Sequence, residues 1–101
     1  MIRVNEYCEG KIKSFGFQIE GVEHTLGLMM PGDYTFDMEI EGQITATWGE
    51  FEIKYTGKDW KMMRPGDNIR IPPNSIVNYR VKRPAAYVCK FPQGFKRCKE
   101  V

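Results

Sequence analysis

Short runs of alternating polar and apolar residues, each ended by a turn signal, repeat along this chain of 101 residues. Alternation with period two predicts β-strands, and no segment keeps the 3.6-residue apolar period of an amphipathic helix over several turns. About nine such strands with regular turns predict an all-β sandwich or barrel in one domain. The expected strands are residues 11–17, 25–30, 34–40, 43–48, 51–55, 60–63, 68–71, 76–82 and 86–91.

Charge and hydropathy exclude several classes of protein. The net charge is +2 and both signs are mixed along the chain, which argues against a nucleic-acid partner. The locally basic stretch 96–99 is expected to be a solvated, frayed terminus. No apolar run approaches the ~18 residues of a membrane span, and the first residues lack the pattern of a signal peptide. We therefore expect no membrane association and a cytoplasmic protein.

The cysteines do not form a metal-binding or disulfide pattern. Cys8, Cys89 and Cys98 are odd in number and contain no CxxC pair. Structural zinc sites need four Cys or His ligands with close spacing, and the chain has one histidine, His24. Reduced thiols are the expected state.

Several blocks of sequence together resemble one small bacterial cupin family, the pyrimidine/purine nucleoside phosphorylases. The resemblance spans residues 5–91, and the chain departs from the family pattern at residues 18–26 and continues beyond it at 92–101. The matching features are Asn5-Glu6-Tyr7, Gly10-Lys11, residues 13–17, residues 32–36, Thr45, Gly49, Asp59-Trp60, the Gly66 to Pro72 spacing, Pro84, Tyr87 and Cys89.

This resemblance implies both a fold and an activity. It implies a single cupin domain over residues 1–101, with a jelly-roll β-barrel at about 5–91 and a C-terminal extension at 92–101. It also implies a metal-independent pentosyltransferase of broad specificity. Such an enzyme cleaves purine and pyrimidine nucleosides with inorganic phosphate to free base and ribose 1-phosphate. The expected partners are thus a nucleoside and phosphate, with no cofactor.

The metal-ligand positions of other cupins carry unsuitable residues in this chain. The similarity places Thr35, Asp37, Gly42 and Val77 where metal-binding cupins have histidines and a glutamate. A single carboxylate does not make a metal site. We therefore expect no bound metal, which argues against a metal-dependent oxygenase or isomerase.

Strand alternation predicts which side chains reach the interior. If Val77 takes the place of an inward histidine, then Tyr79 also points inward, whereas Asn78 and Arg80 point outward. The same comparison places Thr35 and Asp37 inward on the earlier strand.

We predict that Asp37 and Tyr79 are catalytic and that Thr35, Val77 and Tyr87 contact the substrate. Such a cavity would be aromatic with a few hydroxyls, which suits a stacked base and a hydrogen-bonded sugar. Asp37 has two interpretations: it binds ribose hydroxyls or acts as an acid inside the cavity, or it is a hydrated structural residue at the mouth.

Phosphate requires a basic residue or a cluster of backbone N–H groups. Lys13 lies in the best-matched block and Arg70 lies on a strand, so both are predicted to bind substrate; Lys11 and Arg80 are further candidates. The alternative is that all four are solvated surface charges.

A second function fits the same residues. A non-catalytic, metal-free cupin that binds a sugar or another small molecule would also have a tyrosine-lined cavity, and only the family blocks favour the enzyme. We expect a homodimer, because small cupins commonly pair through sheet faces or edges.

Overall fold

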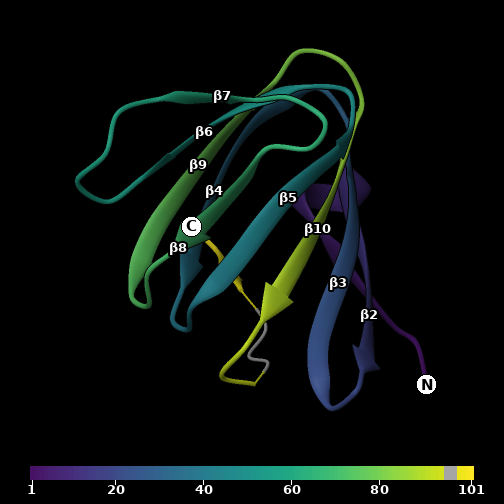
Figure 1. Cartoon of the computed structure of the whole chain (residues 1–101). Coiled ribbons are helices and arrows are strands. Elements are labelled where there is room, and N and C mark those ends of the chain that lie inside the picture. The colour runs from purple at the N-terminus through teal and green to yellow at the C-terminus, as the bar shows by residue number, and fades with distance from the viewer. Residues whose placement is uncertain (95–97) are drawn as a thin grey trace.

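Two antiparallel β-sheets face each other in the computed structural model, which describes residues 1–94 and 98–101 (Figure 1). Sheet A has six strands in the order β1-β2-β3-β10-β5-β8, and sheet B has five in the order β11-β4-β9-β6-β7. The strands of sheet A are β1 (Arg3–Tyr7), β2 (Ile12–Ile19), β3 (Val22–Met29), β10 (Ala85–Phe91), β5 (Gly42–Trp48) and β8 (Asn68–Ile71). Those of sheet B are β11 (Lys99–Glu100), β4 (Gly32–Met38), β9 (Ser75–Val81), β6 (Phe51–Tyr55) and β7 (Lys61–Met63). A 3-10 turn, η1 (Cys8–Gly10), joins β1 to β2.

The predicted all-β class is confirmed, and each of the nine expected strands is present with small shifts at its ends. Two strands, β1 and β11, were not predicted. Among the described strands no backbone pairing connects sheet A to sheet B. The closed jelly-roll barrel is therefore not confirmed, and the two facing sheets are the architecture that the structure supports.

The β2–β3 hairpin shows how local sequence sets the register of sheet A. Glu20 and Gly21 form its two-residue loop, with φ of 50° and 79°, and Ile19 pairs directly with Val22. Two successive positive φ values are typical of a type I′ turn, whose twist matches that of the flanking strands. The register fixed by this turn places Glu23 and Thr25 on the inner face of sheet A.

The hydrophobic core fills the space between the two sheets. Met29 of sheet A and Phe51 and Val77 of sheet B are 0–1% exposed. The rings of Tyr7 in β1 and Phe36 in β4 meet edge to face at 5.3 Å, which joins the sheets directly. Strand alternation thus sorts the residues as expected, with one buried face on each sheet.

The C-terminal residues correct one expectation. Cys98 packs against the hydrophobic core, and β11 pairs with β4 through Lys99 opposite Asp37 and Glu100 opposite Phe36. The predicted frayed terminus is therefore wrong for Cys98, which packs against the core. It is also wrong for Lys99, whose backbone pairs with the open edge of sheet B while its side chain stays exposed. Lys96 and Arg97, the other half of that prediction, lie outside the described residues.

Within the described residues, no helix has the length and apolar character needed to cross a membrane.

Candidate functional site

A small cavity lies between the inner faces of the two sheets. Its volume is about 40 Å³, well below the ~300 Å³ or more of typical ligand pockets. The lining residues come from both sheets, with a thiol from the C-terminal segment. They are Tyr7, Ile12, Ser14, Thr25, Met29, Phe36, Met38, Ile44, Tyr79, Tyr87, Cys89, Phe91 and Cys98.

Tyrosines dominate the polar chemistry of this cavity. The rings of Tyr79 in β9 and Tyr87 in β10 are nearly parallel, at 22°, with centroids 6.5 Å apart. Burial raises the pKa of both phenols, that of Tyr79 well above its ordinary value, and each is raised further by neighbouring groups that can ionise. Both hydroxyls therefore stay protonated near neutral pH, where they can donate hydrogen bonds but cannot serve as bases.

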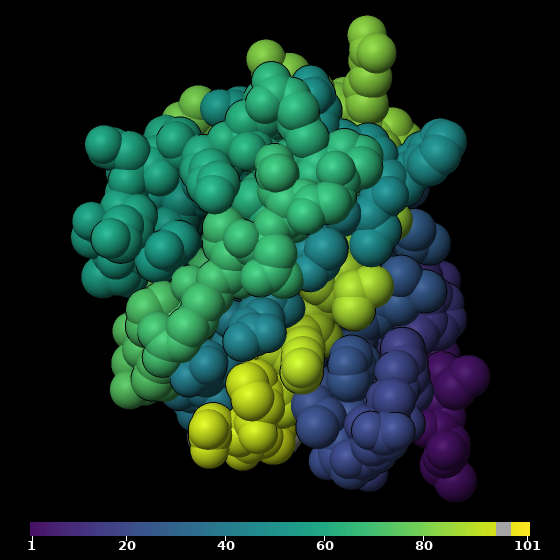
Figure 2. All heavy atoms as spheres, in the orientation of Figure 1, coloured from purple at the N-terminus to yellow at the C-terminus, as the bar shows by residue number. Residues whose placement is uncertain are grey.

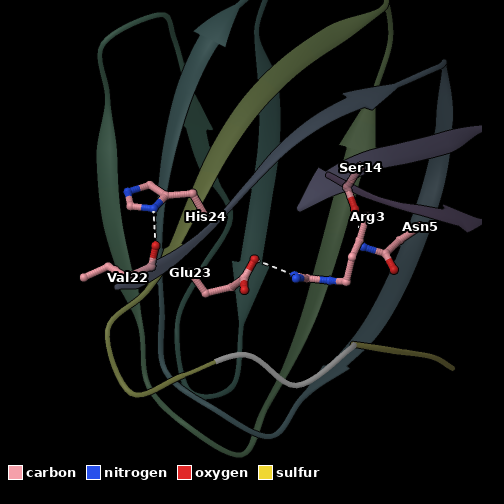
Figure 3. A network of polar contacts seen from close by, with 6 residues as sticks. All are labelled: Arg3, Asn5, Ser14, Val22, Glu23 and His24. Carbon is pink, nitrogen blue, oxygen red and sulfur yellow. Dashed lines mark hydrogen bonds and ion pairs between the residues drawn. The ribbon is translucent and has the colours of Figure 1, made fainter. Parts of the chain in front are cut away.

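A polar network lies on the inner face of sheet A beside the cavity (Figure 3). The Arg3 guanidinium donates to the Glu23 carboxylate, whose side chain is 5% exposed. Gly16 makes room for this arginine, because a Cβ at that position would lie 2.5 Å from Arg3 Nη2. The result is a cation held over the inner face of the sheet, in the cross-strand row that also contains Thr25 and Cys89.

Further hydrogen-bonding groups extend the network toward the cavity. Asn5 Nδ2 donates to Ser14 Oγ at 3.4 Å, and both residues are buried. Ser14 and Thr25 both line the cavity. Sheet A thus presents these two hydroxyl groups to the cavity, while aromatic rings line it from both sheets.

The inward orientation predicted for Val77 and Tyr79 in β9 is confirmed. Val77 and Tyr79 are buried, at 0% and 7% exposed, while Arg80 is exposed and Asn78 is half-buried on the other face. Tyr79 lines the cavity; Val77 lies on the same inner face, in the core. Tyr87 also lines the cavity, as predicted from its strand.

The prediction for β4 is wrong by one residue. Thr35 and Asp37 point to the outer face of sheet B, and neither lines the cavity. Residues directly opposite each other in an antiparallel pair share a face, and Thr35 lies opposite Asn78. Its hydroxyl donates to Asn78 Oδ1 at 2.7 Å on that outer surface. The inward residues of β4 are instead Tyr34, Phe36 and Met38.

The predicted phosphate ligands also lie away from the cavity. Lys13 is exposed on the outer face of sheet A. Arg70 is exposed in β8, where its guanidinium pairs with Glu41 Oε1 at 2.9 Å. The structure describes every strand of sheet A, and within these strands Arg3 is the one basic residue on the face that points toward sheet B.

Sequence reasoning missed the polar network because it did not assign β1 and because Glu23 lies in the stretch that departs from the family pattern. The signal that could have found it is alternation with period two, since Arg3, Asn5 and Tyr7 alternate with Val4 and Glu6 on β1.

Across the described residues, no three His, Cys, Asp or Glu side chains lie together in a way that could hold a metal ion. The absence of a catalytic metal stays a prediction.

Comparison with known proteins identifies sequence relatives over most of the chain. Residues 2–91 match the family model described as pyrimidine/purine nucleoside phosphorylase. A protein of that name from Photobacterium profundum is 33% identical over 92 residues, covering 90% of this chain and 99% of the relative.

Solved structures share the fold of this chain. A protein of unknown function from Vibrio parahaemolyticus superposes with a TM-score of 0.86 at 33% identity, covering 89% of this chain and 97% of that chain. A cupin-2 domain protein from Rhodospirillum rubrum, at 14% identity, has a TM-score of 0.78 over 97% of this chain and 74% of that chain, which shows a cupin-like fold. On the match of its residues 2–91, the chain belongs to the pyrimidine/purine nucleoside phosphorylase family.

Proposed function

We propose that this chain is a metal-independent enzyme that cleaves purine and pyrimidine nucleosides with inorganic phosphate. The observation that carries the proposal is that the family match extends over both sheets around the tyrosine-lined cavity. The products would be the free base and ribose 1-phosphate, and the reaction would be expected in the cytoplasm.

The chemistry requires one bond to form and one to break at the anomeric carbon. A phosphate oxygen attacks C1′ as the bond from C1′ to the base nitrogen breaks, through an oxocarbenium-like state. The electron pair of the broken bond stays with the base, which needs a hydrogen bond or a proton as it leaves. Positioning and electrostatics supply most of the catalysis in such a reaction.

The tyrosines support a role at the leaving base. Tyr79 and Tyr87 are protonated at neutral pH because burial raises their pKa values, so each can donate to a base nitrogen or oxygen. Their near-parallel rings also offer apolar surface to any base. Contact through ring faces does not depend on one pattern of donors and acceptors, which accounts for broad specificity.

The polar network supports binding of phosphate and ribose. Arg3 is a fixed cation on the inner face of sheet A, and guanidinium groups bind phosphate oxygens in pairs. The Ser14 and Thr25 hydroxyls and the Glu23 carboxylate suit the ribose hydroxyls. Arg3 therefore takes the role that sequence analysis gave to Lys13 and Arg70.

A homodimer fits the outer face of sheet A. Val4, Phe15, Leu26 and Val88 lie directly opposite one another across four neighbouring strands, and Val4 and Leu26 are 62% and 40% exposed. An apolar row of this kind on a sheet face is typical of an interface. Sedimentation velocity would test pairing of two copies, which a Leu26→Lys substitution should abolish.

The decisive assay measures free base released from uridine and from inosine, with and without inorganic phosphate. Release from both nucleosides that depends on phosphate supports the proposal. Equal release without phosphate would indicate a hydrolase, and no release from any common nucleoside would favour the non-catalytic binding protein.

A further inference from the structure

We propose that residues Cys98–Val101, here called the C-terminal strap, close the cavity and must detach before a nucleoside can enter. The strap would regulate access to the proposed active site, so this inference rests on the proposed function. It concerns a part of the chain that lies beyond residues 2–91, the extent of the family match.

The strap is attached to both sheets. On sheet B, β11 adds to the edge strand β4, and the Val101 N–H donates to the Thr35 carbonyl at 3.1 Å (Figure 1). On the other side, the Glu100 carboxylate accepts a hydrogen bond from the backbone N–H of Cys8, in the turn that follows β1 of sheet A. The strap therefore bridges sheets that no described strand pairing connects.

The same segment contributes a wall of the cavity. Cys98 lines the cavity together with Cys89, and it packs against the hydrophobic core. Figure 2 shows no wide opening on the face in view, where the end of β10 and the turn after it, in yellow, lie between the blue β2–β3 hairpin and the green and teal strands. With the strap in place the cavity has about 40 Å³, whereas ligand pockets typically have ~300 Å³ or more. The cavity as observed is therefore too small for a nucleoside, and Cys98 of the strap is one of the residues that bound it.

The attachments are of a kind that can break without unfolding the protein. The strand β11 has two residues, and the ion pair between Lys99 Nζ and Glu39 Oε1, at 3.0 Å, involves a lysine side chain that is 66% exposed. Exposed ion pairs contribute little, and short terminal elements open locally more readily than core strands. Because an active site open for only part of the time binds its ligand with proportionally lower apparent affinity, the strap would reduce nucleoside affinity.

The experiment compares four chains: the full chain, a chain ending at Pro92, the full-length Glu100→Ala variant, and the full-length Lys58→Ala variant. Lys58 lies in an exposed turn after β6, so its variant serves as a control. The first readout is the rate at which N-ethylmaleimide alkylates Cys89, measured by peptide mass spectrometry. Cys89 is 3% exposed and lines the cavity, so its labelling reports access and requires no enzyme activity.

We expect labelling of Cys89 to be roughly tenfold faster in the shortened chain, and clearly faster in Glu100→Ala, than in the full chain and Lys58→Ala. Thermal melting verifies that the shortened chain is folded, and Glu100→Ala gives an independent answer if it is not. Equal labelling rates in the full chain and Glu100→Ala would overturn the proposal that the strap closes the cavity.

The second readout is the KM for uridine, which should fall in the shortened chain by a factor similar to the gain in labelling. Faster labelling with an unchanged KM would overturn the role of the strap in substrate entry. If none of the chains released base, the proposed function would fail, and the labelling rates alone would decide whether the strap closes the cavity.

Discussion

The ring of Tyr87 occupies the space that a side chain at Gly27 would need. A Cβ built at Gly27 would lie 2.2 Å from Tyr87 Cζ, and the two residues are directly opposite each other on β3 and β10. A contact this short cannot be accommodated unless the ring moves. The glycine therefore sets the position of a tyrosine that lines the cavity.

A Gly27→Ala substitution should displace the Tyr87 ring. We expect the free energy of unfolding to fall by about 1–3 kcal/mol, the usual effect of overpacking, and phosphorolysis to slow. Urea unfolding measures the first effect. In a Gly27→Ala, Tyr87→Ala double variant the clash is absent, so the combined loss should be smaller than the sum of the single losses. Additive losses would show that the two residues do not compete for space.

A Tyr79→Phe substitution keeps the ring and removes only the hydroxyl. If this hydroxyl donates to the leaving base, kcat/KM should fall by an amount equivalent to about 1–3 kcal/mol of transition-state stabilisation. The matched control is Asn78→Ala, the next residue on the opposite face of β9, which should leave kcat/KM nearly unchanged. Equal effects from the two substitutions would remove Tyr79 from the mechanism.

An Arg3→Gln substitution should separate phosphate binding from stability. We expect a higher KM for phosphate and a loss of about 1–3 kcal/mol in unfolding free energy, because the buried Glu23 carboxylate loses a charged donor. An Arg3→Gln, Glu23→Gln double variant has no such carboxylate and should regain stability, while the KM for phosphate stays high. An unchanged KM for phosphate in both variants would rule out Arg3 as the phosphate ligand.

Stability should fall at alkaline pH. Burial, together with the nearby Asp37 carboxylate, raises the pKa of the Cys98 thiol from its ordinary value of 9.0 to about 11. A group with a raised pKa contributes its stabilisation below the unfolded pKa and loses it as pH rises through the folded pKa. The loss should therefore develop between about pH 9 and pH 11, with the buried tyrosines adding to it above pH 10.

Urea midpoints measured across this range in the presence of a reductant would check the prediction. The Cys98→Ser variant should lose less stability than the natural chain over the same interval. An identical pH profile for the two chains would show that the Cys98 thiol does not titrate as the structure implies.

Much of the fold could be predicted from the sequence because alternation and turns are local signals. The break at Pro72-Pro73 and the alternation that follows it placed Val77 and Tyr79 inward correctly. The same reasoning failed on β4, where comparison with metal ligands suggested that Thr35 faces inward. Aromatic burial decides that face instead, because Tyr34 and Phe36 fill the core, and a shift of one residue exchanges every side chain of a strand.

The polar network was harder to predict for a physical reason. A carboxylate such as Glu23 is usually exposed, and its burial depends on the pairing with Arg3, which is 20 positions away in sequence. The strap was missed similarly, because two strand residues carry no periodic signal and their pairing partner is β4, far earlier in the chain. Contacts between distant segments of this kind follow from tertiary structure alone.

The central claim is tested most directly by identifying the sugar product. The purified chain is incubated with uridine and inorganic phosphate, uracil is quantified, and the phosphorus-31 spectrum is recorded. The account predicts a new phosphate ester signal from ribose 1-phosphate that grows in equal amount with uracil, and the same result with inosine and hypoxanthine. Uracil that appears with free ribose and no phosphate ester would contradict it.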